Sequence, residues 1–205
     1  MEKPRIGIQG IESAVWGEHI CVFFNTKDEL LKLTVPYIKA GLEDNEFCMW
    51  ITGEHVTVND ASHALKQALP NVHDYLARKQ LEILPHTQCY FSTGTFDGQI
   101  VLQNWAKKAA HAKAKGFAGM RITGNIFWLE SEQDWEQFGA YEQAVTQNIE
   151  HQRVIALCTY PFEICRFNNV MQTMSVHNKV LIARDEHWRC HDVPPPYRRS
   201  FPPLD

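Results

Sequence analysis

The sequence has 205 residues, six of them cysteines, and a formal net charge of −4 at pH 7. A chain of this length is expected to fold as one domain around one hydrophobic core. Acidic and basic residues nearly balance, so there is no basic stripe of the kind that follows a phosphate backbone, and no direct nucleic-acid partner is expected. No apolar run approaches the roughly 20 residues that cross a bilayer, and residues 1–10 lack a signal peptide's apolar centre. A cytoplasmic protein without a membrane partner is expected.

Short apolar runs alternate along the chain with segments of helical periodicity. A strand is predicted over 19–24, then a helix over 28–44 with Asp28 as its N-cap, then a strand over 46–52. The region 58–80 is predicted as a helix broken near Pro70, because proline removes a backbone donor. The other expected elements are a strand over 81–87, a loop over 89–99, a helix over 99–115 ending at Gly116, a strand over 119–126, a helix over 134–152, a strand over 153–161, a helix over 163–178 and a strand over 179–186.

This alternation of strands and helices predicts the fold class. Strands that are apolar on both faces indicate an α/β protein with a three-layer αβα architecture and a mostly parallel sheet. Residues 1–14 are expected to be an N-terminal extension, and residues 15–190 to form the domain. Residues 191–205 are expected to be a proline-rich tail, either an extended strap or a disordered end.

The carboxyl ends of the predicted strands are the expected binding edge, because ligands of open parallel sheets bind there. Aromatic, amide and histidine side chains gather at these ends, including Asn25, Asn125, Trp128 and Tyr160. This is the composition of a pocket for a modest organic molecule. Trp128 is equally well explained as a core anchor, because indole is amphipathic.

The loop after the first strand argues against a phosphate site. A P-loop needs glycines and a lysine at the helix start, whereas residues 25–29 contain no glycine and two acids. The loop resembles a P-loop whose motif has eroded, so nucleotide hydrolysis is not expected. An enzyme is kept as a further alternative, either a degenerate nucleotide hydrolase using Lys27 or a thiol catalyst using Cys89 or Cys158.

His19 and Cys21 are two residues apart on the first predicted strand, so their side chains project from the same face. Imidazole and thiolate suit zinc, copper or haem iron, and a metal, haem or redox sensor centred on this pair is an alternative function. Without any CxxC spacing, dry packing of a buried thiol is the competing interpretation. A second group of ligand-type residues, His187, Cys190 and His191, is expected to be a solvated strand end.

Arg121 lies inside an apolar strand. A buried arginine has to be paired or reach water, so Arg121 either meets an acid such as Glu142 or contacts a ligand.

Five segments follow one another in a characteristic order. They are GEHICVFF, VPYIKAGLEDNEFCMWIT, YFSTGTFD, GMRITGNIFWLESEQDWEQFGAYEQAV and VIALCTYPFEICRFNNVMQTMSVHN. Over about residues 15–185 they resemble the MEDS domain, the DcmR-like sensory domain of methanogens and methylotrophs. The resemblance implies a RecA/KaiC-like fold with a degenerate P-loop, and a sensor of small hydrocarbon derivatives rather than an enzyme. It also implies that strand 19–24 lies between strands 119–124 and 154–160, which would place Arg121 and Cys158 beside His19 and Cys21.

Two departures from the family pattern matter. Asn125 stands where many relatives carry an acid, so acid chemistry is not expected there. Relatives often carry a DNA-binding or kinase-type domain that is not recognised in these residues, so output is expected through a separate regulatory protein or a homo-oligomer. The sequence therefore predicts a non-catalytic sensory domain that requires no cofactor and binds a small organic ligand. Its candidate ligand-binding residues are His19, Cys21, Asn25, Arg121, Asn125, Trp128, Cys158 and Tyr160.

Overall fold

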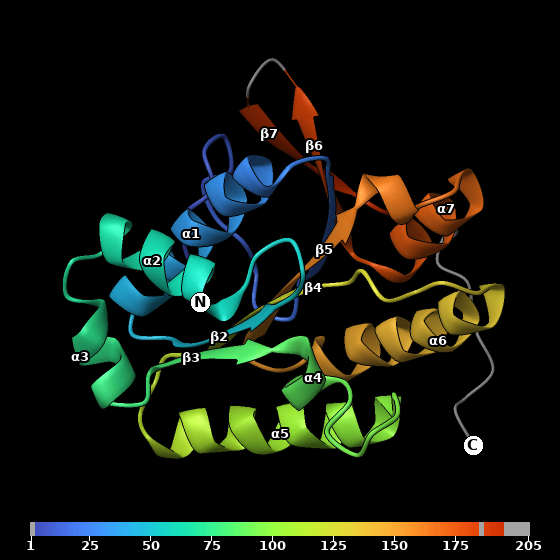
Figure 1. Cartoon of the computed structure of the whole chain (residues 1–205). Helices are drawn as coiled ribbons and strands as arrows, with labels where there is room; N and C mark the ends of the chain where they lie inside the picture. The colour runs from blue at the N-terminus through green and yellow to red at the C-terminus, as the bar shows by residue number, and fades with distance from the viewer. Residues whose placement is uncertain (1–2, 185–186, 195–205) are drawn as a thin grey trace.

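The computed structural model describes residues 3–184 and 187–194 (Figure 1). The described strands are β1 (His19–Phe24), β2 (Phe47–Thr52), β3 (Leu81–Pro85), β4 (Met120–Asn125), β5 (Val154–Pro161), β6 (Lys179–Arg184) and β7 (His187–Asp192). The helices are α1 (Lys27–Glu43), α2 (Val58–Ala68), α3 (Val72–Ala77), α4 (His86–Cys89), α5 (Gly98–Ala114), α6 (Glu132–Ile149) and α7 (Phe167–Val176), with a 3-10 turn at Phe162–Ile164.

The strands form one sheet in the order β3-β2-β4-β5-β1-β6-β7. Neighbouring strands from β3 to β6 pair in parallel, and β7 pairs antiparallel with β6. Helices α1, α2 and α3 cover one face, and α5 and α6 cover the other (Figure 1). The predicted α/β class with a mostly parallel sheet in three layers is confirmed.

Of the two neighbours expected for the first strand, β5 is confirmed and β4 is wrong. β1 lies between β5 and β6, with Cys21 opposite Cys158 on one side and Val180 on the other. β4 lies on the far side of β5, so Arg121 is not beside His19. Strand order depends on which crossovers bury the most apolar surface, and the apolar pattern of one strand does not specify its neighbours.

Each central strand contributes side chains to two separate hydrophobic cores, one on each face of the sheet, because successive side chains point to opposite faces. Along β5, Ile155 and Leu157 pack with α1 and α2, whereas Ala156 and Cys158 pack with α6. Cys21 is on the α6 side, the side on which His19 meets α6, so these two side chains share a face as predicted.

The chain segments flanking the domain differ from expectation. Ile6 and Ile8 are buried against α1, so the described part of the expected N-terminal extension belongs to the core. Gly7 adopts φ +80°, and a Cβ there would lie 2.3 Å from the Pro36 carbonyl oxygen. At the other end, β7 was expected only as a strand end, and it reaches Asp192, inside the expected tail. Residues 195–205 of that tail lie outside the described residues.

Local boundaries differ by a few residues. Thr26, not Asp28, caps α1, because its hydroxyl accepts from the Glu29 backbone N–H. The helix break near Pro70 is confirmed by the gap between α2 and α3. The strand expected over 81–87 ends at Pro85, and the short helix α4 follows it directly, before most of the expected loop. None of the helices in the described residues is long and apolar enough to cross a membrane.

Candidate functional site

Four buried side chains with metal-ligand chemistry meet between the sheet and α6. His19 begins β1, Glu142 lies on α6, Cys158 lies on β5, and His177 follows the end of α7. One ligand atom from each lies within 4.8 Å of all the others, and every one of the four side chains is at most 2% exposed. We call these four residues the buried cluster.

Two imidazoles converge on one carboxylate oxygen in the buried cluster. His19 Nε2 lies 3.2 Å from Glu142 Oε2, and His177 Nε2 lies 3.0 Å from the same atom. The two rings are tilted by 32° to one another, with centroids 3.9 Å apart. His19 Nε2 is also 3.2 Å from Cys158 Sγ. All these atoms are shielded from water.

The remaining ring nitrogens are held by hydrogen bonds that assign their protons. His177 Nδ1 lies 2.7 Å from the Thr173 carbonyl oxygen, which can only accept, so Nδ1 donates. Thr146 Oγ1 donates to the Val176 carbonyl oxygen at 2.6 Å and therefore accepts from His19 Nδ1 at 2.8 Å. From this hydrogen-bond network, both rings carry a proton on Nδ1 and present Nε2 to Glu142.

Burial sets the protonation of the buried cluster. Burial and, after it, the neighbouring His177 lower the pKa of His19 to about 4, although Glu142 opposes the shift. Burial alone would raise the pKa of Glu142, but His19 and His177 outweigh it and hold that pKa below its ordinary value. Burial and the Glu142 charge raise the pKa of the Cys158 thiol. The protein by itself does not activate Cys158 as a nucleophile.

Cys89, the other candidate thiol catalyst, is no better placed. Burial raises its pKa to about 11. A thiol with a raised pKa stays protonated at neutral pH, which disfavours a nucleophilic role.

Cys21 lies outside the buried cluster, and Cys158 lies beside His19 instead. Cys158 is the register partner of Cys21, so it lies diagonal to His19 in the sheet, and the long imidazole side chain places Nε2 3.2 Å from its thiol. The Cys21 thiol donates to the Lys179 carbonyl oxygen at 3.6 Å. Sequence reasoning missed His177 as a member, and it considered Glu142 only as a partner for Arg121. The sequence signal that could have identified Glu142 was its place as an acid on the apolar face of a predicted helix.

Arg121 is paired with Glu46, so the suggested partner Glu142 is wrong. Its Nε donates to Glu46 Oε2 at 2.7 Å, and its Nη2 donates to Oε1 at 2.9 Å. The same guanidinium donates to the carbonyl oxygens of Tyr37 at 2.8 Å and Arg5 at 2.7 Å. Arg121 is the second residue of β4, so this buried ion pair is near the amino-terminal edge, opposite the expected binding edge.

Because Gly41 has no side chain, the Arg121–Glu46 ion pair can pack directly against α1. A Cβ at Gly41 would lie 2.8 Å from both Arg121 Nε and Cys48 Sγ. Alanine normally stabilises a helix interior by about 1 kcal/mol over glycine. Here we expect Gly41→Ala to destabilise the fold by about 1–3 kcal/mol, because the added methyl overpacks the core. Urea unfolding would measure this, with exposed Lys32→Ala on α1 as the control. A stabilised Gly41→Ala protein would contradict it.

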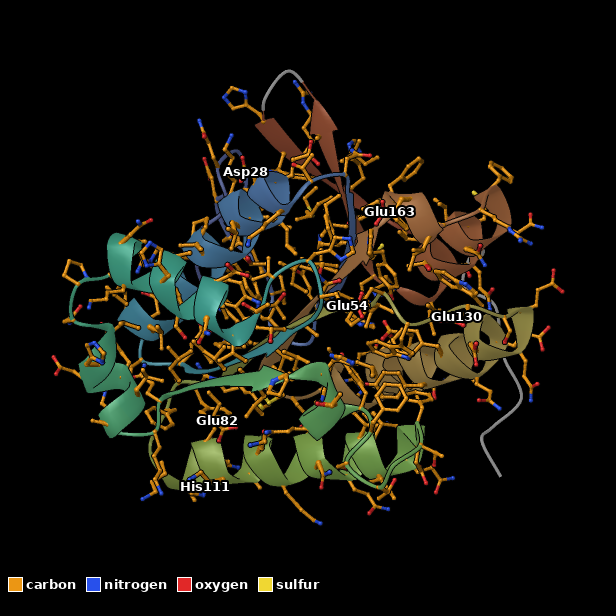
Figure 2. All side chains as sticks on the ribbon, viewed as in Figure 1. Asp28, Glu54, Glu82, His111, Glu130 and Glu163 are labelled. Carbon is orange, nitrogen blue, oxygen red and sulfur yellow. The ribbon has the colours of Figure 1, made fainter. Side chains whose placement is uncertain are left out.

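The loop after β1 has its phosphate-binding positions filled by the protein. The Asn25 backbone N–H donates to Glu29 Oε2 at 2.7 Å. Lys27 Nζ lies 2.7 Å from Asp60 Oδ1, and this ammonium, together with hydrogen bonds from Thr57, lowers the pKa of Asp60 to about 2. Acidic side chains also follow the ends of β1, β2, β4 and β5. They are labelled in Figure 2 as Asp28, Glu54, Glu130 and Glu163. This edge disfavours a polyphosphate.

Asn125 ends β4 at the carboxyl edge and is 3% exposed. It alternates along the strand with Arg121 and Thr123, so its side chain is on the α1 side. Neither its amide nitrogen nor its amide oxygen has a hydrogen-bond partner among the described residues. His55 Nδ1, in the loop after β2, is likewise buried and unpartnered there, while His55 Nε2 lies 3.0 Å from Glu163. Unpartnered buried polar atoms are uncommon and call for an explanation.

Trp128 belongs to an aromatic layer at the same edge. Its ring is stacked with that of His86 at 5.8 Å and lies 4.6 Å from that of Tyr90. The ring of Phe127 packs on Gly53, where an added Cβ would lie only 2.4 Å from Phe127 Cε1. Two hollows, of about 240 and 610 Å³, lie near the opposite, amino-terminal edge of the sheet, and Arg153 lines both of them.

The predicted site residues thus divide into separate groups. His19 and Cys158 belong to the buried cluster, and Tyr160 lies beside it, with its ring 6.1 Å from that of His177. The Tyr160 hydroxyl has no partner among the described residues. Cys21 is on the same face but outside the cluster. Asn25, Asn125 and Trp128 lie at the carboxyl edge, and Arg121 lies near the opposite edge.

Comparison with known proteins identifies the relatives of this chain. The family described as "MEDS: MEthanogen/methylotroph, DcmR Sensory domain" matches residues 18–178. The transcriptional repressor DcmR of Methylorubrum extorquens is 23% identical over 186 residues, which is 83% of this chain and 61% of the repressor. The chain therefore spans less than two thirds of that relative. The KaiC-like protein PH0186 of Pyrococcus horikoshii has a TM-score of 0.57 at 12% identity, covering 92% of this chain and 85% of its own. This likeness confirms the RecA/KaiC-like fold.

Proposed function

The chain belongs to the family of MEDS sensory domains, and on that premise we propose that it binds a small organic molecule at the carboxyl edge of the sheet without turning it over. The observation that carries the proposal is the buried amide of Asn125, which has no partner among the described residues. A ligand with one hydrogen-bonding group would satisfy it. The regulatory sensing role follows from the family; the ligand and its position are our proposal.

The surroundings of Asn125 indicate the chemistry of the ligand. The amide offers a donor and an acceptor, and His55 Nδ1 offers one further polar contact. The ring of Phe127, two residues after Asn125 and 6.4 Å from that of His55, can supply an apolar wall, and Glu29 and Glu163 lie on the same edge. Acids repel an anionic ligand, while apolar walls suit an uncharged one. We therefore propose a small neutral hydrocarbon derivative that carries a polar group.

The filled loop after β1 supports binding of such a molecule over binding of a nucleotide. Asn25 has its backbone N–H bonded to Glu29, and Lys27 is paired with Asp60. A triphosphate would have to break both contacts and to approach several acids. We propose that output passes through a separate regulatory protein or a second copy of this chain.

A thermal-shift comparison tests the proposal. The panel would contain short alcohols, amides and halogenated alkanes, with Mg-ATP as a separate arm. A ligand at a hundred times its dissociation constant is expected to stabilise the protein by about 2.7 kcal/mol. Asn125→Leu is expected to weaken binding roughly tenfold, since it removes about one buried hydrogen bond. Because Trp128 lies at this edge, ligand binding should also change tryptophan fluorescence.

The control variant is Asn148→Leu, which removes an exposed amide on α6. It should bind the ligand like the wild type. Stabilisation by Mg-ATP with no response to any organic molecule would contradict the proposal. So would an organic ligand whose affinity is the same in Asn125→Leu and in the wild type.

A further inference from the structure

The buried cluster contains close polar contacts that do not behave as hydrogen bonds. Glu142 Oε2 and His177 Nε2 are 3.0 Å apart, yet neither atom has a hydrogen-bond partner among the described residues. Both are buried from water. The contact is short, but its direction is wrong for an N–H pointing at an oxygen. An unpaired buried carboxylate oxygen and an unpaired imidazole nitrogen are both costly.

The proton positions sharpen this problem. His19 and His177 both use Nδ1 as the donor, to Thr146 and to the Thr173 carbonyl oxygen. With Nδ1 of each ring bonded in this way, Nε2 is the nitrogen that each histidine turns toward Glu142. Two imidazole nitrogens and a carboxylate oxygen then face a common point, with Cys158 Sγ beside it. A metal ion at that point would give each of these buried atoms a partner.

We propose that His19, Glu142, Cys158 and His177 form a closed binding site for a divalent transition metal of the zinc class. Two imidazoles, one thiolate and one carboxylate are ligands that zinc commonly takes in tetrahedral sites. This proposal goes beyond the organic-ligand site at the carboxyl edge and does not depend on it.

The spacing of the ligand atoms suits a tetrahedral ion. Bonds of about 2.0–2.3 Å in tetrahedral geometry place neighbouring ligand atoms roughly 3.3–3.6 Å apart. In the buried cluster, Nε2 of His19 is 3.2 Å from both Glu142 Oε2 and Cys158 Sγ. Cys158 Sγ lies 3.9 Å from Glu142 Oε1. Small side-chain rotations would seat the ion.

The surroundings supply the outer hydrogen bonds and the charge balance that such a site needs. Metal-bound histidines usually donate their other ring proton to a carbonyl or similar acceptor, as both histidines do here. On binding, the Cys158 thiol loses its proton to solvent, and its sulfur bonds to the metal. The thiolate and the Glu142 carboxylate then neutralise the two charges of the ion, which a site without water requires.

The consequence is a structural link between parts of the fold. The ligands come from β1, β5, α6 and the junction between α7 and β6. Four protein ligands leave no open position for a substrate, so the ion would hold these elements together rather than catalyse a reaction.

Metal content and cobalt spectroscopy test the site on the full chain. Because the cluster is fully buried, the ion is best supplied during synthesis, in medium containing Zn²⁺ or Co²⁺. We expect about one Zn²⁺ per wild-type chain after gel filtration, and at least tenfold less in His177→Ala and Cys158→Ala. The Co²⁺-loaded wild type should show tetrahedral visible bands and a thiolate charge-transfer band, which conservative Cys158→Ser should lose.

Two controls locate the ion. Cys21→Ser removes a buried thiol on the same face and should retain full metal content. Cys190→Ser with His191→Ala removes candidate ligands on β7 and should also retain it. A folded wild-type protein, checked by circular dichroism, with negligible Zn²⁺ and no cobalt spectrum would overturn the proposal. Metal that is lost from the β7 variant and kept in Cys158→Ser would also overturn it.

Discussion

Replacing Arg121 with methionine is expected to destabilise the folded protein by about 3–5 kcal/mol, because Glu46 is left as a buried charge without its partner. Glu46 is 1% exposed, and both of its carboxylate oxygens accept from Arg121. The variant also removes the donors that the carbonyl oxygens of Tyr37 and Arg5 now use. Urea unfolding followed by circular dichroism would measure the change.

The control for Arg121→Met is a charge of the same sign in an exposed pair. Lys39 lies 3.9 Å from Glu43 on the surface of α1, so Lys39→Met should change stability by less than about 0.5 kcal/mol. Combining Arg121→Met with Glu46→Leu should be less damaging than Arg121→Met alone, because no buried charge is then unpaired. A loss below about 1 kcal/mol in the single variant would contradict this account of the ion pair.

Thr146→Val is expected both to destabilise the fold and to weaken metal binding. The hydroxyl of Thr146 links His19 Nδ1 to the Val176 carbonyl oxygen. Without it, these two buried groups are unsatisfied, and each costs about 1–3 kcal/mol. The His19 ring also loses the contact that orients Nε2, which typically weakens a metal site by about 10–100-fold. Urea unfolding and competition with a chelator would measure the two effects.

Thr173→Val is the matched control, because the same chemical change is made at a nearby threonine. The carbonyl oxygen of Thr173, not its side chain, accepts from His177 Nδ1. Metal affinity should therefore be close to that of the wild type. Equal losses of metal in the two variants would contradict the role assigned to the Thr146 hydroxyl.

Much of the fold follows from local patterns in the sequence. The strand over 19–24 was predicted at its observed bounds, since a short apolar run between polar segments marks a buried strand. The break near Pro70 and the layered architecture follow from equally local signals. Helix ends were less predictable, as at Thr26, because several residues can cap the same turn.

The candidate sites were predictable only in part. Polar residues inside apolar strands, such as His19, Arg121 and Asn125, stand out in the sequence because burying them is costly. Their partners do not stand out. Cys21 is two residues from His19 but outside the buried cluster, whereas Cys158, 139 residues away along the chain, lies beside it.

The sequence by itself therefore determined the fold class, the loss of the P-loop motif after β1 and the polar residues that require a partner or a ligand. Only the tertiary structure decided that Arg121 meets Glu46, 75 residues away, and that β1 lies between β5 and β6. The physical reason is the separation along the chain over which each kind of interaction acts. Periodicity and capping act between neighbours in the chain, whereas a buried charge is satisfied by whichever group the packing of distant strands and helices brings within hydrogen-bond distance.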